Sequence, residues 1–149
     1  MLKRYLIIGL IISLFTMFGS CDDGIYRFQK EAEYYFVNET NHVITYPIGY
    51  ERFNISPKSI IVIKESIYIG SRANGAKASD YISPLSLESS TNKLTIKFDN
   101  LKCLIEVKEN DVNSVRNIKN FVAETINDNN YKFTYTFTEA DYNRATTCP

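Results

Sequence analysis

Apolar and polar residues alternate along much of the chain after residue 32, and the clearest case lies near its end. In the stretch 131–138, an aromatic residue alternates with lysine or threonine at Tyr131, Phe133, Tyr135 and Phe137. Successive side chains of a strand point to opposite faces, so this period of two predicts a strand with one apolar and one polar face. A shift of one residue would expose all four rings, so the register of this strand is tightly specified.

The same period, or a short apolar run between turn residues, predicts further strands. They cover residues 33–40, 42–49, 60–70, 92–100, 101–110 and 121–126. The turn residues 38–41 make the first two strands a hairpin, and Pro47 places the second at a sheet edge or at its own end, because proline cannot donate to a ladder. The turn at 99–100 predicts another hairpin, whose second strand is expected to bury Cys103 and Ile105 on one face.

Helix is expected mainly near the C-terminus. Thr138 and Asp141 have the spacing of a capping pair for a short helix over 138–145. Residues 111–126 also fit a helix by the spacing of their valines and isoleucine, but the second half fits a strand, which we favour. Roughly seven short strands predict a mainly β fold, an antiparallel β-sandwich of the immunoglobulin or transthyretin type, as one domain over 33–149.

The first twenty residues have the three-part layout of a secretory signal peptide. Lys3 and Arg4 form the positive start, and the apolar stretch 5–18 follows. A bilayer-spanning helix needs roughly 20 residues, which is longer than this stretch. Small residues then precede Cys21. We predict a cleaved leader over 1–20; the alternatives are an ordinary signal peptide before an unrelated cysteine, and an uncleaved anchor helix.

The sequence Phe-Gly-Ser-Cys at residues 18–21 resembles the lipobox of bacterial lipoproteins, with phenylalanine where leucine is usual. The resemblance implies that the Cys21 thiol is diacylglycerylated, that cleavage occurs before it, and that the new N-terminus is acylated, for example with palmitate. Several acyl chains anchor a protein durably, since each buried methylene contributes about 0.8 kcal/mol. Residues 21–32 are then the lipidated cysteine and a tether, in which Asp22 and Asp23 suit either an outer-leaflet signal or a solvated linker.

Three stretches of the mature chain are similar to small, mostly uncharacterised lipoproteins of Bacteroidetes-type bacteria. They are NETNHVITYPI at 38–48, LTIKFDNLKCLIEV at 94–107 and YKFTYTFTEADYNRA at 131–145. The resemblance implies a lipid-anchored protein of the outer membrane or cell surface, with a periplasm-facing position as the alternative. It carries over no enzymatic activity and no functional residue.

The charge balance argues against nucleic acid as a partner. Lys3 and Arg4 leave with the leader, so the mature chain has 15 basic and 17 acidic residues, a net charge of −2. Binding to nucleic acid requires a basic surface that neutralises phosphates, and no such run is present. The expected partners are the membrane, through the lipid, and a surface protein or glycan.

Few residues are suited to catalysis or metal binding. His42 is the only histidine, whereas zinc sites use several His or Cys ligands and a catalytic triad would need a supporting motif. A glycosidase would need two carboxylates facing each other across a cleft, for which the candidates are Glu139 with Asp141 or Asp99 with Glu106. Solvated strand faces and a helix cap explain these residues better. We predict no enzyme, no catalytic residue, no metal and no cofactor.

Two features of the mature chain remain as candidates for a disulfide and a binding site. Cys103 and Cys148 could pair in an oxidising compartment; alternatively they are unrelated thiols. The irregular loop 71–90 is the longest stretch without a period, and long loops in compact domains are often functional. Asp80 and Tyr81 within it are our candidate binding residues, although Asp80 has no EF-hand spacing for calcium.

Tyrosine is abundant, with eleven residues, and exposed tyrosine rings stack on sugars. Buried tyrosine is equally a routine filler of a sandwich core, and we favour the filler. The sequence thus predicts a non-enzymatic, lipid-anchored envelope protein whose sandwich binds an unspecified ligand. The alternative is a structural or assembly subunit of a surface complex or fimbria-like polymer, with an edge strand available for pairing.

Overall fold

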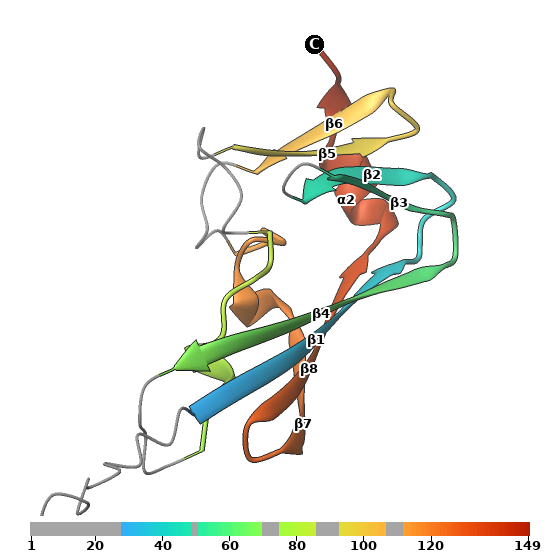
Figure 1. Cartoon of the computed structure of the whole chain (residues 1–149). Coiled ribbons are helices and arrows are strands. Elements are labelled where there is room, and N and C mark those ends of the chain that lie inside the picture. The colour runs from blue at the N-terminus through green and yellow to red at the C-terminus, as the bar shows by residue number, and fades with distance from the viewer. Residues whose placement is uncertain (1–27, 49–50, 70–74, 86–92, 107–111) are drawn as a thin grey trace, which may run out of the picture.

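A computed structural model describes residues 28–48, 51–69, 75–85, 93–106 and 112–149. Two β-sheets pack against each other, with short helical turns and loops between them (Figure 1). The chain therefore folds as a mainly β sandwich, as predicted. The predicted leader, Cys21 and the two aspartates after it lie outside the described residues.

The first sheet has the strand order β4-β1-β8-β7. Its strands are β1 (Phe28–Asn38), β4 (Ile60–Ile69), β7 (Val122–Asn127) and β8 (Asn130–Phe137). The second sheet has the order β3-β2-β5-β6-β9. Its strands are β2 (Ile44–Ile48), β3 (Glu51–Ile55), β5 (Leu94–Phe98), β6 (Lys102–Glu106) and β9 (Thr146–Thr147). Neighbouring strands are antiparallel except β1 and β8, which are parallel.

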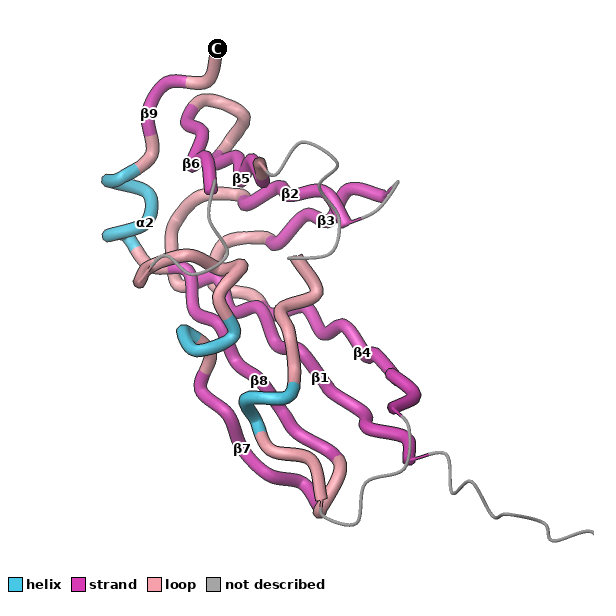
Figure 2. Tube along the Cα trace, turned by 90° about the vertical axis from the view of Figure 1, so that its left-hand side faces the viewer, coloured by secondary structure: helices cyan, strands magenta, loops and turns pink. Residues whose placement is uncertain are grey.

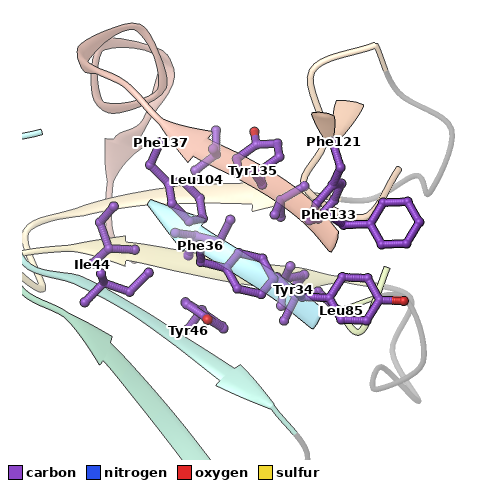
Figure 3. Close-up of a cluster of buried hydrophobic side chains, with 14 of the residues drawn as sticks. Tyr34, Phe36, Ile44, Tyr46, Leu85, Leu104, Phe121, Phe133, Tyr135 and Phe137 are labelled. Atoms are coloured by element: carbon purple, nitrogen blue, oxygen red, sulfur yellow. The ribbon is translucent and has the colours of Figure 1, made fainter. Parts of the chain in front are cut away.

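The core between the sheets is largely aromatic (Figure 3). Tyr34 stacks on Phe133 within the first sheet, with ring centroids 5.4 Å apart, and Phe36 contacts Tyr46 of the second sheet at 5.5 Å. Figure 3 shows Phe137 and Tyr135 on the same side of β8 as these rings. This alternation of buried residues along β8 confirms the predicted apolar face and its register.

Two irregular segments complete the core beside the second sheet. They are residues 75–85, which include the short helix η1 (Ala78–Asp80), and residues 112–121, which include η2 (Ile118–Asn120). Both supply fully buried side chains, among them Leu85 and Val115. A hydrogen bond from Ser83 to the carbonyl of Val115, 2.8 Å long, joins the two segments. These two segments thus cover the part of the inner face of the first sheet that the second sheet leaves open.

The predicted hairpin between 33–40 and 42–49 is wrong. β1 and β2 lie in different sheets, and the chain crosses between them at residues 39–43. The fully buried amide of Asn38 holds this crossing, since its Nδ2 donates to the carbonyls of His42, Ile55 and Ser56. Its Oδ1 accepts from the backbone and hydroxyl of Thr40. The crossing sets the apolar faces of β1 and β2 against each other, which buries both.

Other boundaries also differ from the prediction. β1 begins at Phe28, so residues 28–32, which we assigned to the tether, form a strand whose Ala32 is buried. β3 was not predicted. β2 is not an edge strand, but Pro47 lies one residue before its end, in line with the second alternative. β2 pairs with β5 at Ile44 and Thr45 alone, so no ladder on that side requires an N–H from Pro47.

The second half of the chain follows the prediction more closely. β5 and β6 form the expected hairpin, with Asp99 and Asn100 in the left-handed conformation that these residue types tolerate in turns. β7 confirms the strand favoured for 121–126. The helix α2 (Glu139–Arg144) confirms the C-terminal helix, and the Asp141 carboxylate accepts a 2.8 Å hydrogen bond from the backbone of Thr138, as the capping pair predicts.

The buried face of β6 is reversed relative to the prediction. Leu104, opposite Ile96, faces the core, whereas Ile105 is 47% exposed. Cys103 shares the outer face with Ile105, and it is buried because β9 and Cys148 cover it. The alternation is present in the sequence, but Leu104 makes the opposite face apolar as well, and the direction predicted for the buried face is wrong.

Candidate functional site

A groove of about 440 Å³ lies along the last part of β8. It is bordered by the start of β7, the segment before η2, and the helix α2. Its lining residues are Val112, Asn113, Asn120, Val122, Thr134, Tyr135, Thr136, Thr138, Ala140, Asp141 and Arg144. We call this feature the β8 groove. Volumes above roughly 300 Å³ are typical of ligand-binding clefts.

The β8 groove exists because β8 is longer than its neighbour β7. Val122, the first residue of β7, pairs with Thr134, whereas β8 continues to Phe137 beside β1 (Figure 2). The backbone of Glu39 donates to the carbonyl of Phe137 at 2.9 Å, so the polar groups of Phe137 face β1. Main-chain groups alternate sides along a strand, so the N–H and C=O of Thr136 face the groove.

The rim of the β8 groove combines exposed apolar side chains with one fixed ion pair. Val112 is 81% exposed and Val122 is 65% exposed. At the helix side, Arg144 Nη2 lies 2.6 Å from Asp141 Oδ1 and also donates to the carbonyl of Asn113. The groove thus offers main-chain hydrogen-bonding groups between an apolar rim and a charged rim, an arrangement suited to an extended peptide.

Sequence reasoning did not find the β8 groove. Thr134, Thr136 and Thr138 were recognised as the polar face of a strand; Thr134 and Thr136 lie on β8 as expected, whereas Thr138 follows the strand and caps α2. The groove depends on where β7 begins, and residues 111–126 left that point open between helix and strand. The threonine alternation was the available signal, but it is shared by any strand with a solvated face.

The predicted binding loop is only partly described, and its named residues are engaged within the fold. Tyr81 is 1% exposed, and its hydroxyl donates to the carbonyl of Asn129 at 2.6 Å. Burial raises the pKa of Tyr81 to about 12. Asp80 accepts a hydrogen bond from the backbone of Lys77, and its carbonyl accepts one from Lys30. The ring of Tyr81 therefore fills the core and offers no surface to a ligand, and a binding role for Asp80 and the rest of the loop stays a prediction.

The tyrosines support the role of core filler. Tyr34, Tyr46 and Tyr81 are each no more than 1% exposed. Burial raises the pKa of both Tyr34 and Tyr46. The hydroxyl of Tyr34 donates to the carbonyl of Ile82, whereas the buried hydroxyl of Tyr46 has no hydrogen-bond partner among the described residues. These three rings offer no surface on which a sugar could stack.

Cys103 and Cys148 form a disulfide, which confirms the predicted pairing. Their Cα atoms are 4.9 Å apart, and the residues are separated by 45 positions. The bond lies beside the short ladder between β6 and β9, where the backbone of Cys148 also donates to the carbonyl of Leu101. The C-terminus is thereby fixed to the second sheet.

His42 lies in a polar cluster at the end of the sandwich. Its Nδ1 is 2.5 Å from Asp99 Oδ2, its Nε2 is 4.0 Å from Glu139 Oε2, and its ring stacks on Tyr142 with centroids 3.6 Å apart. The hydrogen bond from His42, with a second from the backbone of Val43, lowers the pKa of Asp99. The cluster joins the β1–β2 crossing to the β5–β6 turn and α2, which is a structural task.

Within the described ranges, no three His, Cys, Asp or Glu residues lie together as a metal site. None of the described helices has the length and hydropathy to cross a bilayer. Comparison of the chain with protein-family models, curated proteins and solved structures finds no match.

Proposed function

We propose that this chain is a non-enzymatic, lipid-anchored protein of the bacterial envelope that binds an extended segment of a partner protein. Binding would occur by strand addition in the β8 groove. The observation that carries the proposal is the main chain of Thr136, which faces the groove beyond Val122, the first residue of β7. In strand addition, main-chain hydrogen bonds supply affinity and flanking side-chain contacts supply specificity.

The side chains of the groove support a peptide over a sugar as the ligand. Val112 and Val122 on the rim could contact alternate side chains of an added strand. Tyr34, Tyr46 and Tyr81 are buried in the core and form no stacking platform for a sugar. A protein segment therefore fits the described surface better than a glycan does.

Photocrosslinking in intact cells tests the groove. A photoreactive amino acid at Val122, 65% exposed on the rim, is compared with one at Leu101, 69% exposed on the distant β5–β6 turn. We expect a discrete crosslinked protein from position 122 only. Thr136→Arg should remove this crosslink, while Thr125→Arg, at an exposed position of β7 outside the groove, should retain it. Equal crosslinking from both positions, or no effect of Thr136→Arg, would contradict the proposal.

The lipid anchor is the second part of the proposal, and it is supported by the leader and the Phe-Gly-Ser-Cys sequence ending at Cys21. We expect the mature protein to begin at Cys21 and to incorporate labelled palmitate. Cys21→Ser should abolish both incorporation and cleavage, whereas Ser20→Ala should preserve them. Unchanged processing when the lipoprotein signal peptidase is inhibited would show that the chain is secreted by the ordinary route.

An assembly subunit remains the second candidate because β4 is a long edge strand. β4 has ten residues, and among the described strands it pairs with β1 alone. Ile60 is 56% exposed and Val62 is 44% exposed on its outer side. Lys64, in the middle of the strand, opposes edge pairing, since charges on edges discourage it. Concentration-dependent oligomers that Val62→Lys abolishes would favour assembly, whereas a monomer at all concentrations would exclude it.

A further inference from the structure

A second, smaller pocket lies on the outer face of the second sheet, away from the β8 groove. It has a volume of about 160 Å³ and is lined by Thr45, Tyr46, Arg52, Thr95, Lys97 and Asn100. Ligand clefts for whole drug-sized molecules start at roughly 300 Å³, so this pocket suits a small ion or one end of a larger ligand. We call it the β2–β5 pocket.

The pocket forms where two neighbouring strands stop pairing. β2 and β5 are paired only at Ile44 with Phe98 and at Thr45 with Lys97. Beyond that point β2 continues beside β3, and β5 continues beside β6. The alternation along each strand puts Thr45 and Lys97 on the outer face. Arg52 and Thr95 share this face by register, so their side chains surround the opening.

The side chains around the β2–β5 pocket are cationic or neutral. Arg52 and Lys97 both line it, and none of the lining residues that the structure describes is a carboxylate. Neither Arg52 nor Lys97 forms an ion pair within the described part of the chain. Thr95 and Asn100 add neutral hydrogen-bond donors. Two positive charges at one small opening favour an anion, especially one with several acceptor oxygens.

The outer face of the first sheet provides the contrast. There, lysines and glutamates alternate across the four strands in one row: Lys64, Glu33, Lys132 and Glu124. Lys64 lies 2.5 Å from Glu33, and Lys132 lies 3.0 Å from Glu124. Each cation of that row is neutralised by the fold itself. Arg52 and Lys97, which line the β2–β5 pocket, also lie on the outer face of their sheet, but no ion pair within the described residues neutralises them.

The geometry points to the β2–β5 pocket as a binding site for an oxyanion group, such as a phosphate, sulfate or carboxylate. Arg52 supplies a planar fork of donors that matches such oxygens, and Lys97 supplies a second charge from the opposite side of the opening. The site lies on the other sheet from the β8 groove and does not depend on the proposed peptide binding. Its ligand is an anion or the anionic end of a larger molecule.

NMR titration of the full-length protein in detergent tests the site. The probes are inorganic phosphate, sulfate and acetate, each against sodium chloride at matched ionic strength. We expect saturable shifts of the amides of Thr45, Thr95 and Asn100 with at least one oxyanion and not with chloride. Stronger binding of phosphate or sulfate assigns a tetrahedral ligand, and stronger binding of acetate assigns a carboxylate.

Charge variants decide whether the pocket is responsible. Arg52→Gln and Lys97→Gln should each weaken binding about tenfold, since hydrogen bonds to charged groups have that effect. Lys119→Gln is the matched control, because it removes one positive charge at an exposed position outside the pocket. Binding that Lys119→Gln weakens as much as Lys97→Gln, shifts that chloride reproduces, or no saturable shift with any of the three anions would overturn the assignment.

Discussion

Removal of the Cys103–Cys148 bond should cause a large loss of stability in the described domain. The bond closes a loop with a sequence separation of 45, and it fixes β9 and the C-terminus to β6. A cross-link restricts the unfolded chain more as the loop grows, and a loop of this size corresponds to about 4 kcal/mol. At the usual unfolding entropy of a domain this long, the loss lowers Tm by about 15 °C.

Thermal unfolding followed by circular dichroism measures the effect. The Cys103→Ser/Cys148→Ser double variant is compared with the wild-type protein, each with and without reductant. The reduced wild type should unfold near the temperature of the double variant, and reductant should leave the double variant unchanged. A difference below about 1 kcal/mol, far under the chain-entropy value, would refute the reasoning. A free-thiol mass on the unreduced protein would show that the bond is not formed.

Three further predictions concern buried polar groups and one surface carboxylate. Tyr46→Phe should stabilise the protein by about 1 kcal/mol in urea unfolding, because it removes a buried hydroxyl that has no partner among the described residues. Tyr34→Phe should destabilise it by a similar amount, because it removes the hydrogen bond to the carbonyl of Ile82. Asn38→Ala should cost about 3 kcal/mol or more in the same assay, since it removes hydrogen bonds to three carbonyls. The pKa of Asp99 is lower in the folded protein than in the unfolded chain. As the pH drops below about 4, the unfolded chain takes up this proton before the folded protein does, so stability falls. Asp99→Asn should flatten this acid limb in urea unfolding at several pH values, and an unchanged limb would contradict the role of the pair with His42.

The individual strands were largely predictable because each buries one face. β8 shows this best: aromatic residues at every second position leave one register that hides Phe133 and Phe137. β5 does the same with its leucine, isoleucine and phenylalanine. The turn at Asp99 and Asn100 was also predictable, since these residue types tolerate the left-handed conformation.

The pairing of the strands was less predictable, since period alone does not tell which strands are neighbours. β1 and β2 are close in the sequence, yet they lie in different sheets, and the buried hydrogen bonds of Asn38 stabilise the crossing between them. In the sequence, a short polar residue between two strands is compatible both with a hairpin turn and with a crossing between two sheets. The parallel pairing of β1 with β8 joins segments almost 100 residues apart and leaves no local signal.

The candidate sites depend on pairing and were therefore missed. The β8 groove requires β7 to begin at Val122, and the β2–β5 pocket requires β2 and β5 to separate after Thr45. The residue types indicate neither the start of β7 nor the separation of β2 from β5. Tyr81 illustrates the reverse error, because a polar, irregular stretch can still supply a ring to the core. The disulfide was predictable as a possibility, since two cysteines remain once Cys21 is assigned to the proposed anchor.

Hydrogen exchange of the protein bound to its crosslinked partner tests the central claim most directly. Strand addition in the β8 groove predicts slower amide exchange in peptides that cover residues 134–138 upon binding, with Thr136 as the site of the new main-chain bond. The edge strand β4, at Ile60–Ile69, should exchange as it does in the unbound protein. Protection of β4 with unchanged exchange at 134–138 would contradict the account and would place the partner at the opposite edge of the sheet.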